Sequence, residues 1–125
     1  EKRFPEGSTS NFSKVIALDP ALIASHAPSN AYHVIITHSH PLDEAICFAL
    51  LSKDQFRFCG LIGSKTKNAR FRSRLSKMGI KAEQLKKLTC PIGIDEINSK
   101  QPVKVAISIA AQLSIWQETN GIRME

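Results

Sequence analysis

The sequence predicts an α/β fold in which a parallel sheet is flanked by helices. Short runs of β-branched residues alternate with stretches of helical periodicity, as in successive strand–helix–strand units with short connections. The run Tyr32–Thr37 is apolar without clean alternation, which is typical of a strand that is covered on both faces. Ligands of such sheets bind beyond the carboxyl ends of the strands, so we expect a site in the loops there.

The first thirty residues carry the weakest signals. Residues 1–13 contain Pro, Gly and several Ser or Thr residues without periodicity, and they indicate a loop or arm. The apolar run Val15–Ala17 predicts a short strand. Asp19 followed by Pro20 predicts the cap and the first residue of a brief helix that extends to about Ser25.

The next helix is predicted to begin at Pro41, a residue that suits the first helical position. Asp43 and Glu44 lie in its first turn, where the positive end of the helix dipole is sufficient to explain them. Cys47 lies in the apolar stripe of this helix and Cys59 in the following strand. Both cysteines are therefore expected to be core residues.

The stretch Arg57–Leu75 organises the rest of the chain. It predicts a strand that ends at Ile62, a tight Gly63–Ser64 turn, and a helix that starts on Ser64. Helix starts favour acidic residues, because their free N–H groups carry about half a positive charge, whereas this helix begins with cations: Lys65, Lys67 and Arg70. The cations either extend into water or face an anion, and a turn of this kind can hold a phosphate.

The remaining elements follow from breakers and periodicity. Gly79 is expected to end the basic helix, and a second short helix is predicted over Ala82–Leu88. The segment Thr89–Ile94 predicts a final short strand or an extended loop. The last helix is predicted over about Pro102–Trp116 and is expected to be mostly buried, because it is apolar on two sides. Residues 117–125 are polar and are expected to fray.

Composition and charge limit the possible functions. The length of 125 residues and the 42% hydrophobic content indicate one globular domain. No apolar run approaches the roughly 18 residues that a membrane span needs, and three scattered cysteines without a CxxC pair favour a reducing, cytoplasmic setting. Eight basic residues and no acidic one lie between Gln55 and Ala82, which favours an anionic partner. Nucleic acid is disfavoured, because exposed aromatic residues do not alternate with these cations.

Three loops are predicted to leave strand ends and to line one crevice: Thr37–Pro41, Gly63–Lys67 and Cys90–Gly93. The expected ligand-binding residues are Thr37, His38, Ser39, His40, Gly63, Ser64, Lys65, Lys67, Arg70 and Cys90. The two histidines could bind a metal, but no third ligand is evident nearby, so a positioning or helix-capping role is favoured. No set of residues suited to hydrolysis is apparent, and no metal site is predicted.

These loops and the last helix resemble the C-terminal Rossmann-like domain of the XdhC family, the xanthine dehydrogenase accessory proteins. The resemblance covers about Tyr32–Trp116 and lies in Thr37–His40 with Asp43, Gly60–Lys67, Ala69–Phe71 with Leu75, Cys90–Gly93, and Ala106–Ala111. It identifies residues 1–125 as a partial domain of this family. It also implies a Rossmann-like parallel sheet flanked by helices.

The resemblance implies a cytoplasmic maturation factor rather than a turnover enzyme. Members of the family are thought to bind the molybdenum cofactor, to assist its sulfuration, and to deliver it to an apo-enzyme of the xanthine dehydrogenase type. The phosphate, dithiolene and oxo groups of molybdopterin suit a basic crevice. Cys90 could then hold molybdenum or carry sulfur as a persulfide, although a cysteine before a proline is also explained by packing alone.

The sequence departs from the family pattern in ways that keep two alternatives open. It has no GxGxxG turn, so we expect the first strand–helix unit to be absent. In addition, Lys104 stands where the family commonly has Glu, and Asn98 stands where it commonly has Gly. One alternative is an NAD(P)- or other nucleotide-binding oxidoreductase-like or regulatory domain. The other is a dimerisation module. An uncovered apolar sheet edge also predicts a homo-oligomer.

Overall fold

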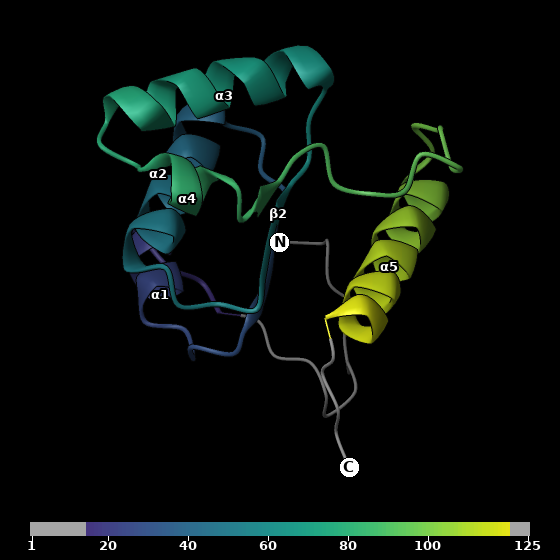
Figure 1. The fold of residues 1–125 in the computed structure, drawn as a ribbon, viewed down its shortest axis with the longest axis horizontal. Coiled ribbons are helices and arrows are strands. Elements are labelled where there is room, and N and C mark those ends of the chain that lie inside the picture. Colours follow the sequence, from purple (N-terminus) through teal and green to yellow (C-terminus); the bar gives the residue numbers. More distant parts are fainter. Residues whose placement is uncertain (1–14, 121–125) are drawn as a thin grey trace.

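The structure is a computed structural model, and it describes residues 15–120. Within this part, helices and strands alternate along the chain (Figure 1). In order they are α1 (Pro20–Ser25), β1 (Tyr32–Ile35), α2 (His40–Lys53), β2 (Phe58–Leu61), α3 (Lys65–Lys77), α4 (Ala82–Leu85), β3 (Leu88–Thr89) and α5 (Pro102–Thr119). The predicted arm over residues 1–13 and the last five residues of the predicted tail lie outside the described residues.

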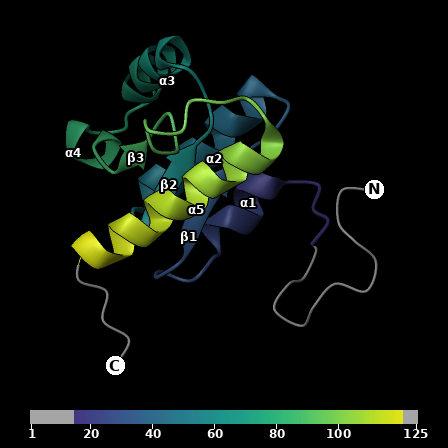
Figure 2. The same ribbon diagram turned by 90° about the vertical axis from the view of Figure 1, so that its right-hand side faces the viewer.

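The three described strands form one parallel sheet in the order β1-β2-β3. Tyr32 is opposite Phe58 in the β1–β2 pair, and Cys59 is opposite Leu88 in the β2–β3 pair. Helices α1 to α4 lie on one side of this sheet, whereas α5 crosses the other side (Figures 1 and 2). The prediction of an α/β fold with a parallel sheet flanked by helices is confirmed.

The core lies between the sheet and helices α2 and α3. Leu61 of β2, Leu51 of α2 and Leu75 of α3 are completely buried. Cys47 and Cys59 are also completely buried, so their prediction as core residues is confirmed. Burial raises the pKa of the Cys59 thiol to about 12, which leaves this thiol uncharged and unreactive at neutral pH.

Polar side chains cap the starts of helices α1 and α2. The Asp19 carboxylate accepts a hydrogen bond from the Leu22 amide at 3.2 Å, as predicted. At α2 the cap is Ser39, whose hydroxyl accepts from the Leu42 amide at 3.2 Å. His40 is therefore the first residue of α2, and both the suggestion that it caps the helix and the predicted start at Pro41 are wrong.

The boundary between α4 and β3 is set by a side chain from another element. The predicted helix over Ala82–Leu88 ends at Leu85, because Leu88 already belongs to β3. The Arg72 guanidinium of α3 donates to the Leu85 carbonyl at 2.7 Å and to the Leu88 carbonyl at 2.6 Å. Arg72 thereby satisfies the carbonyls that the chain exposes where it changes from helix to strand.

The predicted strand over Val15–Ala17 is wrong. This segment has no regular structure, and the side chains of Val15 and Ile16 are 71% and 83% exposed. Its residue types suit a strand, but no described strand lies beside it to supply the hydrogen bonds that define one. Local propensity therefore gave no strand here.

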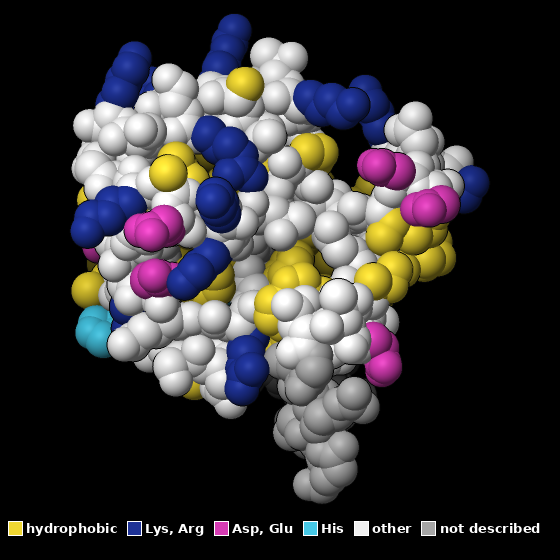
Figure 3. Space-filling view, in the orientation of Figure 1, with side chains coloured by type: hydrophobic (Ala, Val, Ile, Leu, Met, Phe, Trp, Pro, Cys, Tyr) yellow, Lys and Arg dark blue, Asp and Glu magenta, His cyan; other side chains and the backbone are white. Residues whose placement is uncertain are grey.

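The expectation that α5 is mostly buried is also wrong. Only Ser108 and Ile109 of this helix are buried, and apolar side chains such as Val103 and Ile115 are exposed. An apolar groove of about 580 Å³ separates α5 from the sheet, and Figure 3 shows hydrophobic side chains in a hollow between them. The helix also continues through Thr119, so residues 117–119 are helical rather than frayed.

Candidate functional site

A groove of about 400 Å³ lies where helices α2 and α3 begin. Its walls come from the first turns of the two helices, including His40 of α2 and Ser64, Thr66 and Arg70 at the start of α3. These starts follow the carboxyl ends of β1 and β2, which is where ligands of a parallel sheet bind. The groove therefore lies at the end of the sheet that the sequence predicted.

The groove is backed by an aromatic side chain. Phe71 of α3 is 4% exposed and lines the groove. The His40 ring meets it edge to face, with ring centroids 6.4 Å apart and planes at 83°, and the Lys67 ammonium lies 5.3 Å from its centroid. The groove thus has an apolar floor beneath polar walls, as small-molecule sites commonly do.

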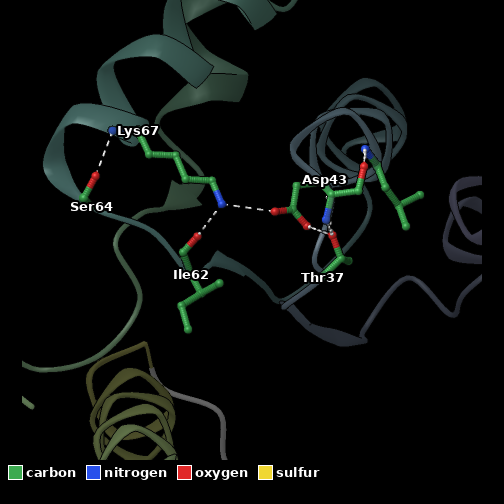
Figure 4. A network of polar contacts seen from close by, with 7 residues as sticks. Thr37, Asp43, Ile62, Ser64 and Lys67 are labelled. Atoms are coloured by element: carbon green, nitrogen blue, oxygen red, sulfur yellow. Dashed lines mark hydrogen bonds and ion pairs between the residues drawn. The ribbon is translucent and has the colours of Figure 1, made fainter. Parts of the chain in front are cut away.

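A buried ion pair joins the two strand-end loops beside the groove (Figure 4). Asp43 is 0% exposed. One of its carboxylate oxygens accepts a hydrogen bond from the Thr37 hydroxyl at 2.6 Å, and the other lies 3.1 Å from the Lys67 ammonium. Lys67 also donates to the Ile62 carbonyl at 3.1 Å. The pair therefore connects the end of β1 to the end of β2.

This network corrects the interpretation of Asp43 as a residue explained by the helix dipole. Its carboxylate is instead the internal counter-ion of Lys67, one of the cations that were expected to face an anion. Gly63 makes the pairing possible, because a Cβ atom at Gly63 would lie 2.8 Å from the Lys67 Cδ atom. The absence of a side chain at Gly63 leaves room for the lysine stem to reach Asp43.

The start of α3 retains groups that can bind an anion. The Ser64 hydroxyl accepts a hydrogen bond from the Lys67 amide at 3.1 Å, so Ser64 is the N-cap, and the helix begins at Lys65 rather than on Ser64 as predicted. The amides of Lys65 and Thr66 precede the first hydrogen bond of the helix and have no partner within it. They also carry the positive end of the helix dipole.

The charges in the groove largely cancel in pairs. Asp43 neutralises Lys67, and Glu44 accepts hydrogen bonds from the Arg74 guanidinium. Arg70 remains, because its guanidinium forms no hydrogen bond or ion pair with another residue in the described part of the chain. Among the described residues, the groove therefore offers one uncompensated cation beside a helix start. Lys and Arg side chains gather over α3 at the top of Figure 3.

The structure brings only part of the predicted site together. His40, Ser64, Lys67 and Arg70 line the groove. The remaining predicted residues do not line it, although several support it: Thr37 through Asp43, Ser39 as the cap of α2, and Gly63 through Lys67. His38 and Lys65 are exposed outside the groove.

Cys90 lies in the third predicted loop, after β3. Its side chain is partly buried and packs against the core rather than lining the groove. Burial raises the pKa of the Cys90 thiol, and the nearby cations Arg72 and Lys67 lower it by less. The thiol is therefore protonated at neutral pH, which makes it a weak nucleophile in this conformation.

Pro41 and Thr66, which lie in two of the predicted loops but were not among the expected ligand-binding residues, also line the groove. Glu44, Phe71 and Arg74 line it from outside the predicted loops. Phe71 and Arg74 lie about one turn and two turns after Lys67 on α3, so helical periodicity could have placed all three on one face. Among the described residues, no group of three or more His, Cys, Asp and Glu side chains could hold a metal ion. No helix among them is long and apolar enough to cross a membrane.

Comparison with known families gives a match to most of the chain. The family described as the XdhC Rossmann domain matches residues 1–113, which is most of the chain. The search of curated proteins found no match. The three parallel strands flanked by helices agree with a Rossmann-like domain, and membership of this family implies an accessory role toward xanthine dehydrogenase. The chain belongs to the XdhC family.

Proposed function

We propose that this domain binds the molybdenum cofactor in the groove between α2 and α3, as a maturation chaperone for molybdenum hydroxylases of the xanthine dehydrogenase type. The observation that carries this proposal is the uncompensated Arg70 guanidinium beside the free amides of the α3 start. The terminal phosphate of molybdopterin suits that combination of a cation and helix amides. The apolar floor formed by Phe71 suits the pterin ring.

The proposed roles of the other predicted residues follow from their positions. His40 and Ser64 contact the ligand from the groove walls, and Lys67 contributes through its exposed edge while it remains paired with Asp43. Thr37, Ser39 and Gly63 hold these groups in place. His38, Lys65 and Cys90 act only if the bound ligand extends beyond the groove.

The proposed setting is the cytoplasm, and the proposed partner is the apo-enzyme that receives the cofactor. The described cysteines are free thiols, which suits a reducing compartment. In this proposal Cys90 accepts sulfur only when its loop opens, because its thiol is otherwise partly buried and protonated. A nucleotide is the alternative ligand of the groove, since it also joins a ring to a phosphate.

Replacing Arg70 with glutamate is expected to weaken binding of the molybdenum cofactor by about 10- to 100-fold, because a hydrogen bond to a charged group contributes about 1.5–3 kcal/mol. Cofactor released from a molybdenum enzyme would be titrated into the protein, and bound pterin and molybdenum would be measured after gel filtration. Affinity should fall with salt in the wild type and less steeply in the variant.

The matched control is Lys65→Glu, which reverses one charge in the same helix but outside the groove. Without ligand it should leave stability unchanged or raise it by about 0.3–1 kcal/mol, since it favours the helix dipole. Its effect on binding should be smaller than that of Arg70→Glu. Equal losses in both variants would show that the overall charge of α3, and not this groove, attracts the ligand, and tighter binding of AMP than of the cofactor would favour the nucleotide alternative.

We also propose that the chain assembles with a second copy. β1 pairs only with β2 in the described sheet, and Val34 and Ile36 are exposed beside the apolar groove under α5. The same chain exposes Val15 and Ile16, which suit a strand but pair with none of the described strands. If each copy placed this segment on the edge of β1 in the other, the strand edge and these exposed apolar side chains would be covered together.

Replacing Val34 with lysine is therefore expected to shift the protein from dimer to monomer, because it puts a charge at the edge of β1. Sedimentation velocity at several protein concentrations measures the shift. The control is Ile115→Lys, which changes an exposed apolar residue of α5 outside the groove and should leave the assembly intact. A wild-type chain that stays monomeric at high concentration contradicts the proposal.

A further inference from the structure

A second cavity lies at the opposite end of the sheet from the groove between α2 and α3. It has a volume of about 500 Å³ and includes Arg57 and Phe58, where β2 begins, together with Trp116 near the end of α5. The other cavity lies beyond the carboxyl ends of the strands. The two cavities share no lining residue.

Among residues 15–120, three cations and no acidic side chain line this second cavity. Lys87 is paired with Asp54 at 2.8 Å. The side chains of Arg57 and Lys86 are exposed and form no hydrogen bond or ion pair with any residue from 15 to 120. The carboxyl end of α5 also lies here and adds about half a negative charge. The charges of Arg57 and Lys86 outweigh it, so the lining of the cavity has a net positive charge.

The aromatic side of the cavity is held in place by ring contacts. Trp116 meets Tyr32 edge to face at 5.7 Å and Phe58 at 6.0 Å, with interplanar angles of 82° and 77°. The Trp116 side chain is neither fully buried nor fully exposed. The two ring contacts hold the indole in place, and its partly exposed side chain lines the cavity.

We propose that this cavity binds a small ligand in which an aromatic ring carries a phosphate, such as a nucleoside phosphate. The ring stacks in the aromatic part beside Trp116, and the phosphate pairs with Arg57 and Lys86. The volume of about 500 Å³ falls within the range of about 300–1,000 Å³ that is usual for small-molecule sites. The proposal does not depend on the function proposed for the groove between α2 and α3.

The chain contains a single tryptophan, so its fluorescence reports on this cavity directly. Adenosine 5′-monophosphate would be titrated into the full 125-residue protein with excitation at the red edge of indole absorption, and calorimetry would be run in parallel. We expect a saturable change in fluorescence. The double variant Arg57→Glu with Lys86→Glu should weaken binding by at least about tenfold, which corresponds to 1.4 kcal/mol.

A matched control changes the same total charge elsewhere. Lys77→Glu with Lys104→Glu replaces two exposed lysines that line neither cavity, and it should keep wild-type affinity. Adenosine alone and inorganic phosphate alone should bind much more weakly than the monophosphate, because each lacks one half of the recognised ligand.

Four results would overturn the proposal. The first is no binding by either fluorescence or calorimetry. The second is equal affinity for adenosine or inorganic phosphate alone, which would assign recognition to one group only. The third is an equal loss in the charge-matched control. The fourth is a loss in Arg70→Glu with retention in the Arg57 and Lys86 variant, which would place the ligand in the groove between α2 and α3.

Discussion

Replacing Asp43 with asparagine is expected to destabilise the folded chain by about 3–5 kcal/mol, because it leaves a largely buried ammonium group without its counter-ion. Asparagine preserves the shape of the side chain and can still contact Thr37, so the loss reports on the charge of Asp43. The Lys67 side chain is 15% exposed and the Asp43 side chain is fully buried. Urea-induced unfolding, followed by circular dichroism at neutral pH, measures the change.

The chain supplies a surface pair as the control. Asp54 accepts from Lys87 at 2.8 Å, with side chains that are 33% and 53% exposed. Asp54→Asn should change the free energy of unfolding by at most about 1 kcal/mol, and asparagine tolerates the positive φ of 56° at this position. A loss in Asp43→Asn no larger than this would contradict the role of the buried pair.

A double variant separates pairing from burial. Lys67→Met keeps an unbranched stem and removes the ammonium, so Asp43→Asn combined with Lys67→Met should regain much of the stability that Asp43→Asn alone loses. The same variants test the site, because Lys67 lines the groove. Asp43→Asn frees the charge of Lys67, so any of this protein that remains folded should bind an anion at least as well as wild type.

The helices and strands could be predicted where the signals are local. The start of α3 was predicted on Ser64, one residue before the observed first residue Lys65, and Gly79 ends the helix with a φ of 106°, as predicted. The partner of Lys67 could not be predicted, because Asp43 lies 24 residues earlier and its position in a first helical turn already had an adequate local explanation. Only the packing of α2 beside α3 brings the two side chains together.

The wrong predictions for Val15–Ala17 and for α5 share one physical cause. Val15–Ala17 has the residues of a strand, but a strand exists only through hydrogen bonds to a neighbouring strand. In the same way, the apolar residues on two sides of α5 suit burial, but burial also requires another part of the protein to pack against them, and several of them are exposed. Local propensity therefore located the strand-end loops, whereas the lining of the groove depended on tertiary contacts.

Replacing Gly93 with alanine is expected to destabilise the fold by about 2–4 kcal/mol and to release the loop that carries Cys90. Two effects add: Gly93 has a φ of 113°, which costs other residues about 1–2 kcal/mol, and a Cβ atom would lie 2.6 Å from the Ser108 hydroxyl. That hydroxyl accepts from the Ile94 amide at 2.7 Å, and Gln112 accepts from the Gly93 amide at 2.6 Å. A displaced loop would therefore lose both hydrogen bonds to α5.

Gly79→Ala separates the two effects, because Gly79 has a similar φ of 106° but no atom within 4 Å of a built Cβ. Gly79→Ala should lower the free energy of unfolding only by the backbone strain of about 1–2 kcal/mol. The difference in stability loss between Gly93→Ala and Gly79→Ala therefore measures the contact with Ser108. Labelling with a thiol reagent gives a second readout. The label reports on Cys90, because Cys47 and Cys59 stay buried in both variants. Cys90 should react faster in Gly93→Ala than in wild type, and its rate of labelling should not change in Gly79→Ala. Equal stability losses with unchanged labelling of Cys90 would show that Ser108 does not hold this loop against α5.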